Sequence, residues 1–134
     1  MYLVDTNIFL EVLLSQAKKE ECEKLLDQFK KSKKLGIITD FTVHSIIVTM
    51  YSYERLEALK VFLSSLTGYK GLRIYPTDLT NEIKATELAT QNKLDMDDAI
   101  QYAIALDTNV EAIVSFDKHF NNLKIPRKEP HQIT

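Results

Sequence analysis

Aspartates stand close to the points where short apolar segments of this sequence end. Asp5, Asp40 and Asp117 each follow such a segment directly or within three residues. Carboxylates that meet at one edge of a sheet could bind Mg²⁺, which is held by a few carboxylate oxygens and keeps several waters. Aspartate is also a preferred residue at the N-cap of a helix. For any one of these residues taken alone, capping is the commoner role.

A second group of acids opens the segment LDMDDAIQYAIA, in which Asp95, Asp97 and Asp98 lie within four residues. A helix N-terminus favours negative charge, and an acid followed by another three residues later resembles a capping arrangement. Capping accounts for two of the acids, whereas the third repels its neighbours unless a positive charge lies between them. The segment therefore predicts a helix over Met96–Leu106 and a candidate cation site at its start.

Short apolar runs alternate with helical patterns along the chain. Strands are expected at residues 2–4, 37–38, 72–75 and 111–114, with a short last strand near 132–133. Helices are expected at residues 7–14, 18–34, 43–50, 54–66, 79–92 and 96–106. This order predicts an α/β fold, a three-layer α/β/α sandwich around a mostly parallel sheet of four to five short strands. Ligands of such sheets bind outside the carboxyl ends of the strands.

Length and composition are those of a single globular domain over residues 1–134. Hydrophobic residues make up 45% of the chain, and 17 basic against 19 acidic residues give a net charge of −2, so no global basic field indicates nucleic acid. The single cysteine, Cys22, cannot form an internal disulfide. With no signal peptide and no apolar stretch long enough to span a membrane, we expect a cytoplasmic protein.

Taken in order, these motifs resemble the PIN-domain ribonucleases, which include the VapC-type toxins of toxin–antitoxin pairs. Val4–Asn7 is similar to the Asp-Thr-Asn that follows the family's first strand. Asp98–Ala99 is similar to the Asp-Ala pair that begins a later alanine-rich helix. Ser115–Asp117, with Phe120 nearby, is similar to the Thr/Ser-x-Asp that ends the fourth strand. The resemblance spans nearly the whole chain.

The resemblance implies a divalent-metal-dependent endoribonuclease that hydrolyses RNA phosphodiester bonds. Asp5, Asp98 and Asp117 would be its catalytic residues and would bind Mg²⁺ or Mn²⁺. The implied partners are an RNA substrate, an antitoxin protein and a second copy of the chain in a homodimer.

Other residues would support these aspartates. By the same resemblance Asn7 and Ser115 would orient them, with Asn7 also capping the first helix, and Asp97 would accept hydrogen bonds or metal-bound waters. Among the basic residues, Lys118 and His119 are expected to face the site because they directly follow Asp117. Further candidates for the site are Asp95, Asp40 and His44.

One position departs from the family pattern. A glutamate is usual on the helix after the second strand, but the segment TDFTVHSII places Ser45 there, or His44 if the alignment slips by one residue. Asp40, at the start of the same helix, is the nearest acid. Without this glutamate two tightly held metals are disfavoured, although three aspartates remain for one. The alternative function is a PIN-like module that binds RNA or protein and whose catalysis is impaired.

Two other classes of protein also place acids at strand ends. Phosphatases of the haloacid dehalogenase type carry Asp-x-Asp after the first strand, where this chain has Asp5-Thr6-Asn7. Phosphoaspartate receivers carry an acidic pair on that strand, which is missing after Val4. Both classes are disfavoured by these substitutions.

Overall fold

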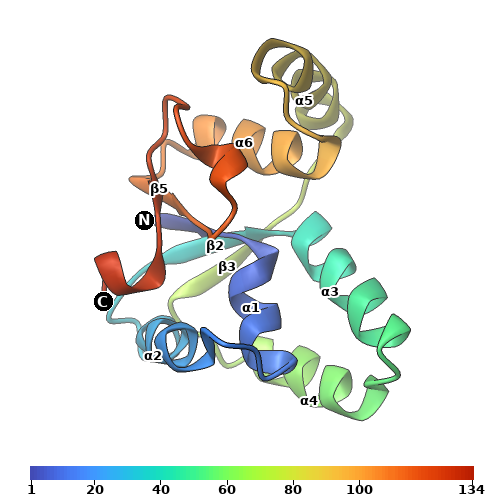
Figure 1. The fold of residues 1–134 in the computed structure, drawn as a ribbon, viewed down its shortest axis with the longest axis vertical. Helices are drawn as coiled ribbons and strands as arrows, with labels where there is room; N and C mark the ends of the chain where they lie inside the picture. The colour runs from blue at the N-terminus through green and yellow to red at the C-terminus, as the bar shows by residue number, and fades with distance from the viewer.

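Five parallel strands form the centre of the molecule, in the spatial order β3-β2-β1-β4-β5 (Figure 1). The computed structural model describes all 134 residues. The strands are β1 (Tyr2–Val4), β2 (Gly36–Thr39), β3 (Leu72–Tyr75), β4 (Ala112–Val114) and β5 (Arg127–Lys128). The helices are α1 (Thr6–Leu13), α2 (Lys19–Lys30), α3 (Asp40–Ser52), α4 (Leu56–Leu66), α5 (Leu79–Asn92) and α6 (Met96–Thr108). Two short 3₁₀ helices, η1 (Lys118–Phe120) and η2 (Pro130–Gln132), lie near the C-terminus.

The sheet is covered by helices on both faces because both faces of its strands are apolar. Leu3 and Ile113 belong to the cluster formed with α5 and α6, whereas Val4 and Val114 belong to the cluster formed with α1 to α4. Successive residues of a strand point to opposite faces, so each short strand supplies both cores. The predicted three-layer α/β/α sandwich is confirmed, with α5 and α6 on one side and α1 to α4 on the other (Figure 1).

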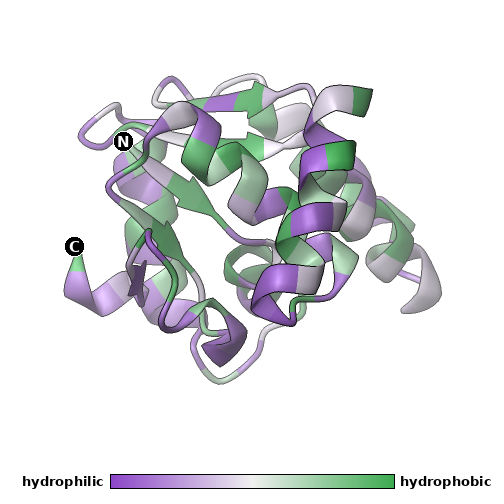
Figure 2. Cartoon of the chain, turned by 90° about the horizontal axis from the view of Figure 1, so that it is seen from above, coloured by the Kyte–Doolittle hydropathy of each residue, from purple (hydrophilic) through white to green (hydrophobic).

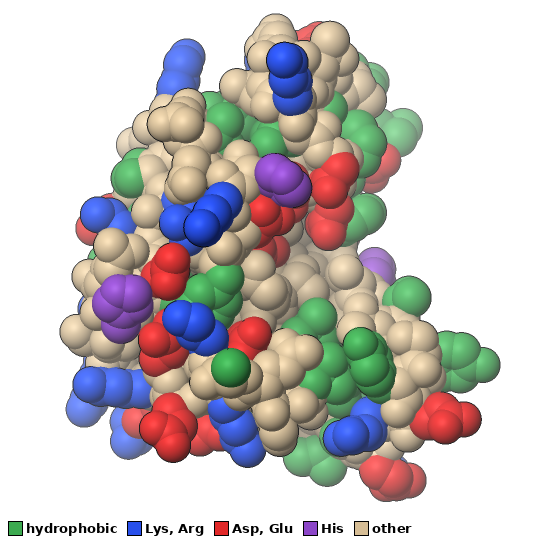
Figure 3. Space-filling model, in the orientation of Figure 1, with side chains coloured by type: hydrophobic (Ala, Val, Ile, Leu, Met, Phe, Trp, Pro, Cys, Tyr) green, Lys and Arg blue, Asp and Glu red, His purple; other side chains and the backbone are tan.

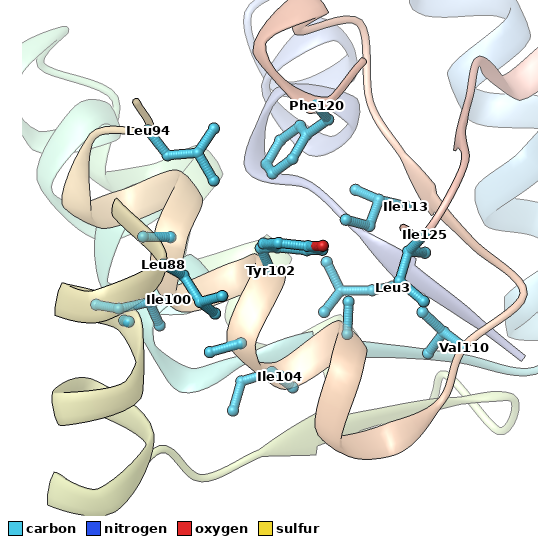
Figure 4. Packing of buried hydrophobic residues seen from close by; sticks show 14 of the residues in the cluster. Leu3, Leu88, Leu94, Ile100, Tyr102, Ile104, Val110, Ile113, Phe120 and Ile125 are labelled. Carbon is cyan, nitrogen blue, oxygen red and sulfur yellow. The ribbon is translucent and has the colours of Figure 1, made fainter. Parts of the chain in front are cut away.

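Helix α6 lies between the sheet and α5, and all eight residues from Asp98 to Ala105 are buried. Its Tyr102 and Ile104 pack with Leu3, Ile113 and other strand residues in the core on this side (Figure 4). A helix that is buried on most sides needs small residues at several positions, which accounts for its alanines. In Figure 2 the central strands are mainly hydrophobic, whereas hydrophobic and hydrophilic residues alternate along the helices.

The strand register brings the two central carboxyl ends together. Strand β1 pairs with β4 so that Val4 lies opposite Val114. The backbone amide of Asp5 continues this ladder and donates to the carbonyl of Val114 at 3.0 Å. The residues that follow β1 and β4 therefore share the point where the strand order reverses, which is the usual ligand site of an open parallel sheet.

Two local expectations are wrong. The last strand lies at Arg127–Lys128, where it pairs with β4, and the predicted residues 132–133 fall at the end of η2 instead. Pro130 begins η2, and its fixed φ angle suits a helical first turn. Asn7 lies inside the first turn of α1, and the cap is Asp5, which has extended backbone angles and accepts from the amide of Thr6.

Cys22 and the lengths of the helices complete the description of the fold. Cys22 is a free cysteine of α2, and its side chain is buried in the core. None of the helices is both long and apolar enough to cross a membrane.

Gly71, before β3, is held against the backbone that follows α2. Its amide donates to the carbonyl of Phe29 at 2.8 Å, and an added Cβ would lie 2.7 Å from that oxygen and overlap the carbonyl oxygen of Lys34. We expect Gly71→Ala to lower the free energy of unfolding by about 1–3 kcal/mol, because backbone atoms must shift to admit the methyl group. Urea unfolding measures this change.

Gly68→Ala is the matched control. An added Cβ there meets only the carbonyl oxygen of Ser65, at 3.4 Å, which is close to ordinary contact. The control should stay within about 0.5 kcal/mol of the original chain. Equal losses in the two variants would contradict the steric argument.

Candidate metal centre

Asp5 is buried at the carboxyl end of β1, with 5% of its surface exposed, and both of its carboxylate oxygens are saturated with hydrogen bonds. Oδ1 accepts from the Thr6 amide at 2.7 Å and from Gln101 Nε2 at 2.8 Å. Oδ2 accepts from Ser115 Oγ at 2.6 Å and from Asn7 Nδ2 at 3.0 Å. These bonds occupy the four acceptor positions of a carboxylate. A direct bond from Asp5 to a cation would have to replace one of them.

Asn7 and Ser115 join the two strand ends. Asn7 Nδ2 also donates to Ser115 Oγ at 3.2 Å, and Ser115 Oγ accepts from the Asp117 amide at 2.9 Å. The Ser115 hydroxyl thus links Asp5, after β1, to the loop that carries Asp117, after β4. Both residues therefore lie where the sequence expects side chains that orient the aspartates.

The N-terminus of α6 supplies the other acids. Asp95 caps the helix, accepting from the Asp98 amide at 2.9 Å. Asp98 is 5% exposed, and its Oδ2 and Asp97 Oδ1 are buried atoms without a hydrogen-bond partner. Burying a carboxylate oxygen without a donor is costly. A cation is the kind of group that would satisfy the Asp98 oxygen.

Asp98, Asp117 and His119 each offer one donor atom within 4.8 Å of the others. His119 Nδ1 lies 3.1 Å from Asp117 Oδ1 and 3.7 Å from Asp98 Oδ2. Two ligands of one Mg²⁺ ion lie at most about 4.2 Å apart, so small side-chain rotations would bring the three onto one ion. Figure 3 shows acidic side chains beside a histidine at the rim of a hollow between the helix layers. The two carboxylates are donors that suit Mg²⁺ or Mn²⁺, whereas the imidazole is a donor more typical of transition-metal ions.

Burial and mutual repulsion raise the pKa of several of these acids. For Asp5 burial raises the pKa, hydrogen bonds from Ser115, Gln101 and Thr6 lower it, and the charge of Asp117 raises it slightly. The pKa of Asp97 rises to about 6, first through burial and then through the charges of Asp5 and Asp95.

The largest of these increases is at Asp98. Its pKa rises to about 8, again chiefly through burial and next through the charge of Asp117. A bound cation would offset both causes and keep these carboxylates ionised.

Asp40 lies apart from this group and has a structural partner. It opens α3, and its Oδ1 accepts from the Thr77 hydroxyl at 2.8 Å and from the Thr77 amide at 3.1 Å. These bonds connect the start of α3 with the segment between β3 and α5. The structure thus gives Asp40 a role in holding this connection.

His44 and Ser45 also lie outside the group of three donors. His44 is exposed on α3 and Ser45 is half-buried. Buried hydroxyls lie near the start of α3 instead. Thr42 Oγ1 accepts from Thr39 Oγ1 at 3.2 Å and from Thr6 Oγ1 at 3.5 Å. These hydroxyls join the first turns of α1 and α3. Position 45 holds a serine, so it does not supply the carboxylate that the family pattern has there.

Two residues of the centre are not apparent from the motifs. Gln101 contacts Asp5, and its signal in the sequence is a polar residue among alanines and isoleucines, one turn after Asp98. His119 is expected to face the site as a basic residue, but the structure places its ring nitrogen as a donor beside two carboxylates. The 3₁₀ turn of η1, capped by Asp117, produces this placement.

The family description PIN domain matches residues 2–126 of this sequence. The chain is a PIN-domain protein. The resemblance to PIN domains that the sequence motifs indicate is therefore confirmed. A comparison with curated proteins gave no significant match.

Solved structures share the PIN fold at low sequence identity. A toxin–antitoxin complex from Klebsiella pneumoniae has a chain that superposes with a TM-score of 0.74 at 19% identity, covering 97% of this PIN domain and 98% of that chain. VapC20 of Mycobacterium tuberculosis, a toxin that cleaves the sarcin-ricin loop, gives 0.72 at 14% identity over 87% and 90%. VapBC2 of Rickettsia felis, bound to a promoter DNA fragment, gives 0.71 at 15% identity over 96% and 97%. These likenesses establish the fold.

Proposed function

We propose that this PIN domain is a divalent-metal-dependent endoribonuclease. The observation that carries the proposal is the convergence of Asp98, Asp117 and His119 donor atoms within 4.8 Å, beside the buried Asp5, where β1 and β4 end. Three acids lie at one sheet edge, and the pKa values of two of them are raised by burial and by neighbouring charges. Keeping all three ionised is unfavourable, and a bound cation would stabilise them.

Each residue has a distinct part in this proposal. Asp98, from α6, and Asp117, from the loop after β4, would hold Mg²⁺ or Mn²⁺, with His119 as an adjoining donor. Asp5 adds negative charge and orders Ser115 and Asn7 around it. The bound ion would activate a water and offset the charge that develops on the scissile phosphate. Asp97 would accept hydrogen bonds from waters of this centre through its buried, unpartnered Oδ1.

RNA is the proposed substrate, approached through its phosphates. Lys118 and His119 are exposed directly after Asp117. The positive charge of Lys118 therefore lies at the edge of the acid group, beside the imidazole of His119. Arg127 is engaged elsewhere, since it donates to the Ser115 carbonyl and to Glu129. Local positive charge is needed to attract phosphates to this acidic centre, because the chain as a whole has a net charge of −2.

A toxin role with an antitoxin partner forms part of the proposal. Its support is the shared fold with chains whose structures are described as toxin–antitoxin complexes. We also propose a homodimer, since two-fold pairs are the commonest small oligomers and the surface offers large exposed apolar side chains. These are Val48, Tyr51, Leu56, Val61, Leu79 and Ile83. The expected compartment is the cytoplasm.

The second candidate is a PIN-like module that binds RNA or protein without cleaving it. The observation that favours it is Ser45, a half-buried residue where the family pattern has a glutamate. Asp40 is not among the three grouped donors, and its Oδ1 accepts hydrogen bonds from Thr77 instead. The two functions differ in what happens to RNA when metal is supplied.

Removing the metal is expected to abolish cleavage. We expect the purified protein to cut members of a mixed RNA panel with Mn²⁺ or Mg²⁺, to lose this activity in excess EDTA, and to regain it when Mn²⁺ is restored. Gel analysis of end-labelled RNA measures the products. Cleavage that persists in EDTA would contradict a metal-dependent nuclease. RNA binding without cleavage at any metal concentration would favour the binding module.

A further inference from the structure

Gln101 is a fully buried polar residue in the middle of α6. Its exposed fraction is 0%, and it lies one helical turn after Asp98 among alanines and isoleucines. Its side chain crosses from α6 to the end of β1, where Nε2 donates to Asp5 Oδ1 at 2.8 Å. Gln101 is therefore the direct link between Asp5 and the helix that carries Asp97 and Asp98.

The chemistry of Asp5 determines the orientation of the Gln101 amide. An ionised carboxylate only accepts hydrogen bonds, so the NH₂ group must face Asp5 and the carbonyl oxygen must face away. Without this donor, Asp5 Oδ1 would keep only the adjacent Thr6 amide. The carboxylate would then be held on one side by β4 and α1, through Ser115 and Asn7, with nothing holding it from α6.

Stability alone does not explain a glutamine at this position. The Gln101 Oε1 atom is buried and has no hydrogen-bond partner. A buried acceptor without a donor costs free energy, and an apolar side chain of the same length would avoid that cost. The interaction that a glutamine adds and such a side chain lacks is the hydrogen bond to Asp5.

We propose that Gln101 is a positioning residue that holds the Asp5 carboxylate toward the acids of α6 and thereby sets the affinity of the centre for divalent cations. This inference rests on the proposed function, because it requires that the centre binds a metal. The affinity of Asp98, Asp117 and His119 for the ion then depends on the position of the neighbouring Asp5 charge, and so on a residue that makes no bond to the ion. Partners of this kind change metal affinity by about 10- to 100-fold when they are replaced.

The test is a Mn²⁺ titration of the full chain, in which electron paramagnetic resonance measures free Mn²⁺. Gln101→Met keeps the length and packing of the side chain but removes the donor. We expect it to weaken Mn²⁺ binding by about 10- to 100-fold. Its metal-free melting temperature should change little, because the loss of the hydrogen bond to Asp5 is offset by the removal of the orphan acceptor.

Tyr102→Phe is the matched control, since Tyr102 is buried on the same helix and its hydroxyl accepts from the Lys124 amide outside the centre. It should leave Mn²⁺ affinity unchanged. A double variant tests whether Gln101 acts through Asp5: in the Asp5→Asn background, Gln101→Met should have no further effect on Mn²⁺ affinity.

The outcomes separate this inference from the proposed function. Unchanged Mn²⁺ affinity in Gln101→Met, with the original chain binding normally, would overturn the positioning role alone. An equal loss in Tyr102→Phe, or a further full loss in the Asp5→Asn background, would overturn it as well. No Mn²⁺ binding by the original chain would overturn the proposed metal centre and this inference together.

Discussion

Replacing Asp98 with asparagine is expected to reduce Mn²⁺-dependent RNA cleavage by about 1,000-fold or more. Asp98 supplies a buried oxygen that has no hydrogen-bond partner, next to donors on Asp117 and His119. An amide in its place removes one of the two charges that would hold the ion. Metal stabilisation of a transition state is worth several kcal/mol, and each 1.36 kcal/mol is tenfold in rate. Initial rates at saturating Mn²⁺ on one end-labelled RNA measure the change.

Asp78→Asn is the control for this experiment. Asp78 is an exposed N-cap on α5, in the same helix layer, and asparagine caps a helix about as well as aspartate. It removes the same charge and should keep the original rate within about twofold. Cleavage by Asp98→Asn at a rate similar to that of the Asp78→Asn control would show that the acids of α6 are not part of the active centre.

The same Asp98→Asn variant is expected to be more stable than the original chain when metal is absent. A carboxyl whose pKa is higher in the folded than in the unfolded chain binds its proton more tightly when folded. Stability is therefore greatest below the unfolded value of 3.8 and falls as pH rises through the folded values, about 6 for Asp97 and about 8 for Asp98. The metal-free protein should lose stability between about pH 4 and pH 8.

An asparagine at position 98 does not ionise, so much of this pH dependence should disappear. We expect Asp98→Asn to gain on the order of 2 kcal/mol in unfolding free energy at pH 7.5 and to gain little at pH 4. Urea unfolding in EDTA at the two pH values measures both numbers. The Asp78→Asn control should retain the slope of the original chain. An increase in the unfolding free energy of the metal-free protein from pH 4 to pH 8 would contradict this prediction.

Activity and metal-free stability are thus expected to respond in opposite directions to this one substitution. Buried like charges are expensive for the fold, and a functional site accepts such a cost where an ordinary core does not. A purely structural role for Asp98 would predict a loss of stability on replacement. The combined result for Asp98→Asn therefore separates a ligand from a structural acid.

The architecture could be predicted from the sequence because the apolar runs of its strands and the helical spacing of its other apolar residues are both clear. The run Leu72–Tyr75 and the helix Leu79–Asn92 occur at their predicted bounds. The last strand could not be placed, because two residues carry no periodic pattern and β5 depends on pairing with Val114 across the sheet. Asn7 was expected to cap the first helix, whereas Asp5 is both the cap and part of the acid group. The sequence could not show that one aspartate does both.

The candidate site was less predictable than the fold. The motifs identify Asp5, Asp98 and Asp117, but they do not show that the first is saturated with hydrogen bonds while the other two approach a histidine. That distinction depends on register and side-chain rotamers, which arise only when β1, β4 and α6 are packed together. Gln101 was missed for the same reason, since its partner is 96 positions away along the chain.

The most direct test of the metal centre is an anomalous difference map from a crystal of the protein soaked in Mn²⁺. We predict a peak in contact with the carboxylates of Asp98 and Asp117, at metal–oxygen distances of about 2.0–2.3 Å, next to His119. The same soak of Asp98→Asn should show a much weaker peak at this position. No peak there at saturating Mn²⁺, or a peak only at the separate group of Glu21, Glu129 and His131, would contradict the proposed centre.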